Sequence, residues 1–97
     1  MYIRVSTVRF PNQTKADAWI ALFQNSLLNK LEKESKLKKI TFFYPGEGKV
    51  TAIAIYENEE DYLKTEKSIK GEVSDFMKSL DGTIEWQAGN VVLDWNR

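Results

Sequence analysis

The side chains that could do chemistry in this chain include no cysteine and no histidine. Their absence excludes thiol nucleophiles, disulfides, zinc sites with thiolate or imidazole ligands, and an imidazole general base. Any catalysis would depend on Asp, Glu, Lys, Tyr, Arg, Asn or Trp side chains, on a bound cofactor, or on a metal with oxygen ligands. We assign no catalytic residue, and we predict no metal site and no cofactor.

The segment PGEGKVT, residues 45–51, contains the glycines and the lysine of a phosphate-binding loop. A Walker motif places four residues between its glycines and follows its lysine with Ser or Thr at the start of a helix. Here only Glu47 separates the glycines, a valine follows Lys49, and a strand-like alternating run comes next. The segment is therefore predicted to be the turn of a β-hairpin.

A cluster of carboxylates follows this hairpin and could suggest a site for a hard cation. It consists of Glu57, Glu59, Glu60 and Asp61. The cluster lacks the alternating ligand spacing and the glycine of a calcium loop. We interpret it as surface charge that complements the dipole at the start of a helix.

Charge and length narrow the class of protein. The 14 Lys and Arg residues balance the 14 Asp and Glu residues, so no net field attracts nucleic acid or anionic lipid. The N-terminus alternates apolar and polar residues, unlike a signal peptide, and no apolar run is as long as a membrane span. We predict a cytoplasmic protein with one domain, residues 1–97, and with neither nucleic acid nor membrane as a partner.

The first half of the chain has clear periodicities. Alternation predicts a strand over residues 2–10, and apolar residues at helical spacing predict a helix from about residue 14 to residue 33. Two further alternating runs, 40–44 and 50–56, flank the predicted turn and complete a β-hairpin.

The second half is predicted to contain one helix and one strand. Asn58 is predicted to be the N-cap of a helix that ends before the Asp81-Gly82 turn pair, and Gly71 predicts a bend or break within that helix. A final strand follows, in which the apolar positions change parity across Gly89-Asn90. That change predicts a bulge or a tight turn there, with an optional short last strand.

The resulting order, β-α-β-β-α-β, predicts a ferredoxin-like α+β fold. Two right-handed crossovers give a four-stranded antiparallel sheet in the order 4-1-3-2, with both helices on one face. Bulky residues are also predicted on the second face, and a monomer rarely exposes so large an apolar patch. They are Tyr2, Val8, Phe10, Phe42, Tyr44 and Tyr56, or their alternates along the strands. The simplest cover is a second copy, packed sheet against sheet about a two-fold axis.

Several segments in this order carry a resemblance to a known superfamily. They are the short first strand, the helix with a charged connector, the hairpin, YENEEDY at 56–62 and GNVVLDW at 89–95. The chain resembles the dimeric α/β-barrel superfamily, which includes antibiotic-biosynthesis-monooxygenase-like domains. The resemblance implies a homodimer and, as in some members, a pocket between sheet and helices where an aromatic, quinol-like or haem substrate is oxidised without a dedicated metal site. Its haem-degrading members use Asn, Trp and His, and this chain has no histidine, so no catalytic residue is carried over.

The RNA-recognition motif has the same order of elements. It stacks bases on aromatic side chains at two outward positions of its third strand. When Tyr56 is aligned with the last aromatic position of that motif, the stacking positions fall on Thr51 and Ile53, which have no aromatic face. The neutral charge also removes the attraction to phosphate, so RNA binding is not predicted.

The larger aromatic residues and one arginine are the candidates for a ligand site. We predict Trp19, Trp86 and Trp95 in the core or in the dimer interface, with the alternative that one of them forms a wall of a pocket. Arg4 lies mid-strand among apolar residues; pairing with Glu85 is the default, and an anionic ligand or the partner chain are the alternatives. The pocket candidates are Arg4, Trp19, Tyr44, Tyr56 and Trp86.

Two functional hypotheses follow. The first is a small homodimeric α/β-barrel protein that binds a small hydrophobic or aromatic molecule between sheet and helices. The alternative is a cofactor-independent, monooxygenase-like enzyme that acts on an aromatic or quinol-type substrate. The sequence leaves open whether the chain is an enzyme.

Overall fold

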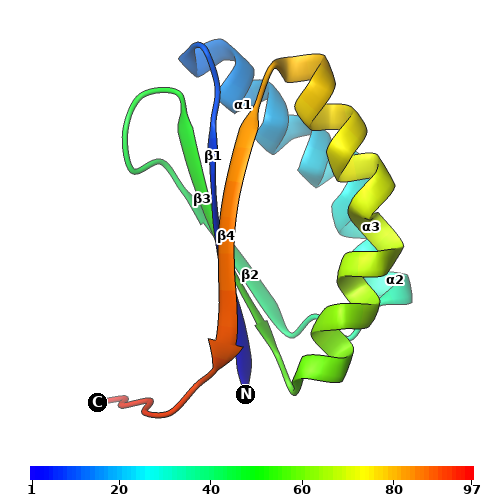
Figure 1. Cartoon of the computed structure of the whole chain (residues 1–97), viewed down its shortest axis with the longest axis vertical. Helices are drawn as coiled ribbons and strands as arrows, with labels where there is room; N and C mark the ends of the chain where they lie inside the picture. Colours follow the sequence, from blue (N-terminus) through cyan, green and yellow to red (C-terminus); the bar gives the residue numbers. More distant parts are fainter.

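The computed structural model describes residues 1–97 and contains one β-sheet with helices on one of its faces (Figure 1). The elements are β1 (Tyr2–Arg9), α1 (Gln13–Leu22), the π-helical segment η1 (Phe23–Leu27), α2 (Leu28–Glu34), β2 (Lys39–Phe43), β3 (Lys49–Tyr56), α3 (Glu59–Leu80) and β4 (Thr83–Asn90). The sheet order is β2-β3-β1-β4, and every neighbouring pair is antiparallel. This order is 4-1-3-2 counted from the other edge, so the predicted ferredoxin-like fold is confirmed.

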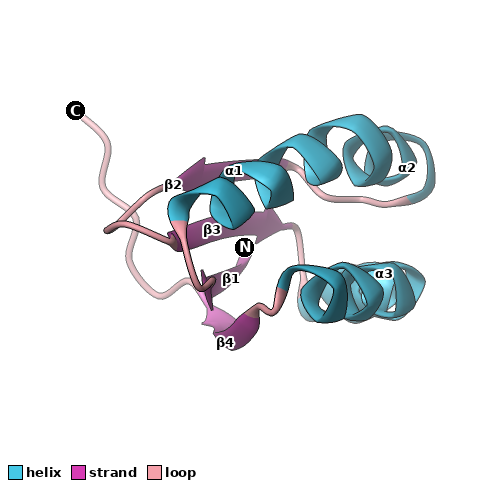
Figure 2. Cartoon of the chain, turned by 90° about the horizontal axis from the view of Figure 1, so that it is seen from above, coloured by secondary structure: helices cyan, strands magenta, loops and turns pink.

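The helices divide the covered face of the sheet between them. The α1-η1-α2 segment lies over the side of β2 and β3, and α3 lies over the side of β1 and β4 (Figure 2). The segment forms the single helical stretch that was predicted, with π-helical geometry over residues 23–27. It begins where the Asn12 side chain accepts a hydrogen bond from the Lys15 amide at 2.9 Å. None of the helices is long and apolar enough to cross a membrane.

Helix α3 is uninterrupted from Glu59 to Leu80, so of the bend or break predicted near Gly71, the break is wrong. Asn58 caps the helix as predicted, because its side chain accepts a hydrogen bond from the Asp61 amide at 2.9 Å. Gly71 is exposed and has no neighbour within 4 Å of the position that a Cβ would occupy. A cost of about 1 kcal/mol for one glycine is small beside the packing of a 22-residue helix on the sheet.

The hairpin turn between β2 and β3 is confirmed, and it is fastened to the start of α1. Gly48 has a positive φ of 72°. Its amide donates to Gln13 Oε1 at 2.8 Å, and its carbonyl accepts from the Phe10 amide at 2.8 Å. A side chain on Gly48 would meet the Phe10 carbonyl at 2.9 Å, so the position requires both the conformation and the small size of glycine.

Strand β4 contains no bulge, so the predicted irregularity at Gly89-Asn90 is wrong. Its pairing with β1 is regular from Arg9 and Thr83 through Tyr2 and Asn90. The change of parity instead marks the end of the strand: β4 ends at Asn90, and just beyond it the Val91 amide donates to the Met1 carbonyl at 2.9 Å. Residues 91–97 leave the sheet on the side away from the helices (Figure 1), and they expose Val92, Leu93 and Trp95. The optional last strand is not formed.

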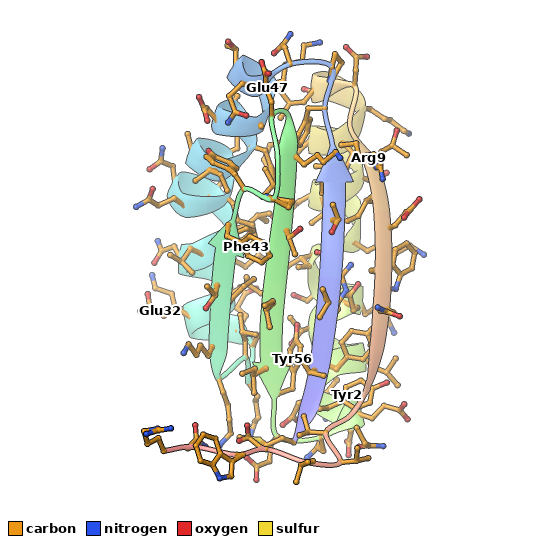
Figure 3. The ribbon with its side chains drawn as sticks, turned by 90° about the vertical axis from the view of Figure 1, so that its left-hand side faces the viewer. Tyr2, Arg9, Glu32, Phe43, Glu47 and Tyr56 are labelled. Atoms are coloured by element: carbon orange, nitrogen blue, oxygen red, sulfur yellow. The ribbon has the colours of Figure 1, made fainter.

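The two faces of the sheet carry different side chains. The predicted bulky residues of the strands mostly point toward the helices, and their alternates form the open face that Figure 3 presents to the viewer. The open face consists mainly of Ile3, Val5, Thr7, Thr41, Phe43, Thr51, Ile53 and Ile55. Its apolar centre lies on the two middle strands, and the Thr7 and Thr51 hydroxyls are hydrogen-bonded there at 2.9 Å. No segment of the chain packs over that centre.

The layer between sheet and helices contains two separate buried clusters. The larger consists of Val8, Phe10, Ala16, Trp19, Phe23, Leu27, Leu31, Val50 and Met77. The smaller consists of Tyr2, Ala54, Tyr56 and Tyr62, with the Tyr62 ring 5.1 Å from Tyr2 and 5.6 Å from Tyr56 between centroids. The clusters lie toward opposite ends of the central strands, because Val8 pairs with Val50 at one end and Tyr2 pairs with Tyr56 at the other.

Candidate ligand pocket

A cavity of about 420 Å³ lies between the sheet and the helices. Hydrophobic residues make up 18 of the 23 that line it. Its size lies within the roughly 300–1,000 Å³ typical of small-molecule sites, and its mostly apolar lining with a few polar groups is also characteristic of such sites.

Small side chains in the middle of the sheet create this cavity. Ser6 on β1 is paired with Ala52 on β3, and the next position facing the helices on β3 is Ala54. The two bulky clusters support the helices above the two ends of the central strands. The small side chains between these clusters are too short to reach the helices. The space above them therefore stays open, although protein interiors normally leave few voids larger than a water molecule.

The cavity opens to solvent between α3 and β4. Two of its lining residues are more than half exposed: Leu63 on α3 at 55% and Trp86 on β4 at 57%. Lys70 and Ser74, also on α3, are exposed lining residues. In Figure 1, α3 and β4 lie side by side at this edge of the molecule.

Arg4 lies on the floor of the cavity and forms an ion pair with α3. Its Nε is 2.9 Å from Glu66 Oε1, and the two side chains are only 16% and 28% exposed. The guanidinium carbon lies 5.6 Å from the centre of the Trp86 ring, within cation–π distance. The expected pairing with Glu85 is wrong: Glu85 is opposite Thr7, and its side chain therefore lies on the open face.

The N–H donors of Arg4 lack hydrogen-bond acceptors within the chain. Nε is buried, and although it is close to Glu66, the contact lacks the alignment of a hydrogen bond. The chain supplies no hydrogen-bond acceptor to the Nη nitrogens either. A guanidinium has five N–H donors. The floor of an apolar cavity thus carries a cation whose bonding capacity is mostly free.

Tyr56 adds a hydroxyl group beside this ion pair. Burial, reinforced by the negative charge of Glu66 and opposed by Arg4, raises the pKa of Tyr56 to about 12. The phenol is therefore protonated at neutral pH and can donate a hydrogen bond. It makes no hydrogen bond to another side chain of this protein.

This pKa predicts a loss of stability in alkaline solution. An unfolded tyrosine loses its proton near pH 10, whereas Tyr56 in the folded chain keeps its proton to about pH 12. The folded state therefore binds more protons in this window, and the free energy of unfolding should fall as the pH rises from 10 to 12. Tyr56→Phe should make that decline shallower in urea unfolding measured from pH 8 to pH 11. An unchanged slope in the variant would contradict the assignment.

Four of the five residues predicted for the pocket line the cavity: Arg4, Trp19, Tyr56 and Trp86. The fifth, Tyr44, lies outside it and is about half exposed. Its hydroxyl donates to Asp17 Oδ1 at 2.7 Å, which raises the pKa of Tyr44 and lowers that of the Asp17 carboxyl. The strand ends at Phe43, so the alternation that would have pointed Tyr44 toward the cavity does not continue.

The three tryptophans have three different environments. Trp19 is in the core, as predicted, with its ring centre 5.7 Å from that of Phe23 and 6.1 Å from that of Phe76. Trp86 is outside the core, at the mouth of the cavity. Trp95 is in the exposed C-terminal segment, where the Arg97 guanidinium lies 5.8 Å from its ring centre.

The sequence reasoning missed Glu66 and Tyr62, both on α3. Glu66 left a signal in the sequence, because it interrupts the helically spaced apolar residues Tyr62, Ile69 and Val73 at a position that faces the sheet. The sequence marks Tyr62 only as an aromatic residue at helical spacing from the other apolar residues of α3. The structure contains no group of three or more Asp, Glu, His or Cys residues that could hold a metal ion.

No protein-family model matches the chain, and no curated protein matches it. Solved structures do match over nearly its whole length. A dimeric ferredoxin-like protein from an uncultured marine organism is 14% identical, with 100% of both chains covered and a TM-score of 0.78. A candidate antibiotic biosynthesis monooxygenase from Deinococcus radiodurans is 13% identical, covering 100% of this chain and 98% of that one, with a TM-score of 0.75.

A third solved structure contains a bound molecule. It is a monooxygenase from Streptomyces coelicolor, from the gene ActVA-Orf6, in complex with the ligand nanaomycin D. It is 13% identical, with 98% of this chain and 92% of that chain covered and a TM-score of 0.73. At these identities the likeness establishes the fold. The ferredoxin-like fold that the superfamily resemblance implies is confirmed.

Proposed function

We propose that this chain is a small homodimeric α/β-barrel protein that binds a hydrophobic or aromatic molecule between its sheet and its helices. The observation that carries the proposal is the cavity of about 420 Å³ with its mainly apolar lining. Filling it with apolar atoms would remove both the ligand and the lining from water and restore the contacts that the void lacks. The ion pair at its floor would orient the ligand.

Larger side chains in the floor of the cavity should weaken this binding. The double variant Ala52→Leu with Ala54→Leu fills the space above the central strands, whereas Ala21→Leu makes the same change at an exposed position of α1. We expect N-phenyl-1-naphthylamine, a neutral probe that fluoresces in apolar sites, to bind the double variant at least tenfold more weakly than the wild type. The Ala21→Leu variant should bind as the wild type does. Circular dichroism checks that each variant is folded.

Two results of this titration would contradict the proposal. One is the absence of any saturable binding to the wild type, and the other is equal affinity in the wild type and the double variant. If the titration instead supports the proposal, mass spectrometry of the native protein would identify a natural ligand that remains bound during purification.

The homodimer is supported by the open face of the sheet. Its centre, made of Ile3, Val5, Ile53 and Ile55, faces solvent in a single chain. Two copies packed sheet against sheet would remove both centres from water, which is the arrangement that the α/β barrel implies. Two of the similar solved structures are described as dimeric ferredoxin-like proteins, which agrees with this assembly.

The alternative function is oxidation of the bound molecule without a dedicated cofactor. It is favoured by the two neighbours that are described as monooxygenases. In this chain the polar groups that could orient an aromatic or quinol-type substrate are Arg4, Glu66 and Tyr56. Uptake of dissolved oxygen, measured after a hydroquinone is added to the protein, separates an enzyme from a binding protein.

A further inference from the structure

The pocket lining contains more positively charged than negatively charged side chains. Arg4, Glu66 and Lys70 are the only charged side chains among its lining residues, so two cations face one carboxylate. Arg4 and Glu66 are mostly buried, whereas Lys70 is exposed at the mouth. The lining therefore carries one net positive charge, and its deeply placed cation is the arginine.

Glu66 neutralises Arg4 from one side only. Its carboxylate contacts Nε, on the inner edge of the guanidinium, and this contact holds the group in place. The Trp86 ring lies close to the guanidinium and restricts it further. The two Nη nitrogens at the far end have no acceptor within the chain. Their paired N–H groups match the two oxygens of a carboxylate, which an arginine binds in bidentate fashion.

A ligand that supplies a hydrogen-bond acceptor to these nitrogens should bind more favourably than one that does not. A buried polar group without a partner is costly, more so when it is charged. A ligand with a neutral, wholly apolar surface would exclude water from the Arg4 donors without replacing the lost hydrogen bonds. A ligand with one negative group would supply the acceptors and balance the excess positive charge. The protonated hydroxyl of Tyr56 offers a further donor beside it.

Resting on the ligand site proposed above, we propose that the natural ligand is an apolar or aromatic molecule with a single carboxylate. The carboxylate binds the Nη nitrogens of Arg4, and the apolar body lies over Ala52 and Ala54. Glu66 is a positioning residue that holds the guanidinium in its orientation.

Matched naphthalene derivatives test this inference directly. 2-Naphthoate is ionised at pH 7, and 2-naphthamide has nearly the same shape without the charge. We expect calorimetric titration of the wild type to give at least tenfold tighter binding of the naphthoate. A double variant, Arg4→Met with Glu66→Gln, should bind both compounds equally, because it removes the guanidinium without leaving a buried carboxylate unpaired. Lys70→Met, which changes only the exposed cation, should retain most of the preference.

A second variant covers the case in which the double variant does not fold. Arg4→Lys keeps the positive charge but has no planar fork, so it should lose most of the preference for the naphthoate while binding the amide as before. The inference is overturned if the wild type binds both compounds equally, or if the preference survives the loss of the guanidinium. Failure of the proposed function is a different result, because there neither compound nor the neutral fluorescent probe would bind.

Discussion

Leu27→Ala should lower the free energy of unfolding by about 2–5 kcal/mol, the range observed for leucine truncations in a packed core. Leu27 is fully buried in the larger cluster, on the π-helical segment that connects α1 to α2. Its removal would leave a void in the larger cluster, within a layer that already contains the cavity. Because the layer already contains a cavity, fewer neighbouring side chains are in contact with the new void and able to fill it. Urea unfolding at a fixed protein concentration measures the effect, since the stability of a dimer depends on concentration.

Leu63→Ala is the matched control for this prediction. It makes the same substitution in another helix, at a side chain that is 55% exposed. The expected change is within about 0.5 kcal/mol, as for most surface substitutions. Similar losses in both variants would mean that the burial of Leu27 does not reflect the packing of the protein in solution.

Ile53→Lys should convert the proposed homodimer into a monomer. Ile53 lies at the centre of the open face, opposite Val5 on β1 and Thr41 on β2. In a sheet-to-sheet dimer, the two new lysines would meet or lie close to each other across the two-fold axis, beside side chains that carry no negative charge. Loss of apolar contact and burial of unpaired charge would both oppose association. At micromolar concentration, light scattering should give the mass of two chains for the wild type and of one chain for the variant.

Leu63→Lys is the control for the dimer experiment. It introduces the same lysine in place of an apolar side chain on α3, on the opposite side of the sheet. This variant should keep the dimeric mass. A monomeric wild type, or dissociation of both variants, would argue against association through the open face.

The elements were largely predictable because their signals are local. Alternation identified all four strands, and the hairpin turn followed from glycines between two such runs. Asn58 was recognised as a cap because a cap depends on residues within one turn of it. The errors arose where a local signal competed with the packing of a whole element. Gly71 has a low helical propensity, yet α3 continues through it because the residues on both sides pack on the sheet.

The pocket was only partly predictable. Arg4 attracted attention as a charge within an apolar strand, and Trp19, Tyr56 and Trp86 as large aromatic residues. The partner of Arg4 was assigned to the wrong element, because the exact pairing of β1 with β4 decides whether Glu85 shares its face. In the structure it does not, and Glu66 takes that place from a helix 62 positions away in the chain. Such a contact depends on how α3 crosses the sheet, which no local pattern encodes.

Composition and periodicity were sufficient to predict the order of strands and helices, the ferredoxin-like topology and the absence of thiol and imidazole chemistry. These properties depend on residue types and on spacings of two or of three to four residues. The cavity could not be inferred in the same way. It exists because small side chains from β1 and β3 meet in the middle of the sheet while bulky clusters support the helices at both ends. Arg4 and Glu66 meet at its floor for the same reason: packing brings together residues that lie far apart in the chain.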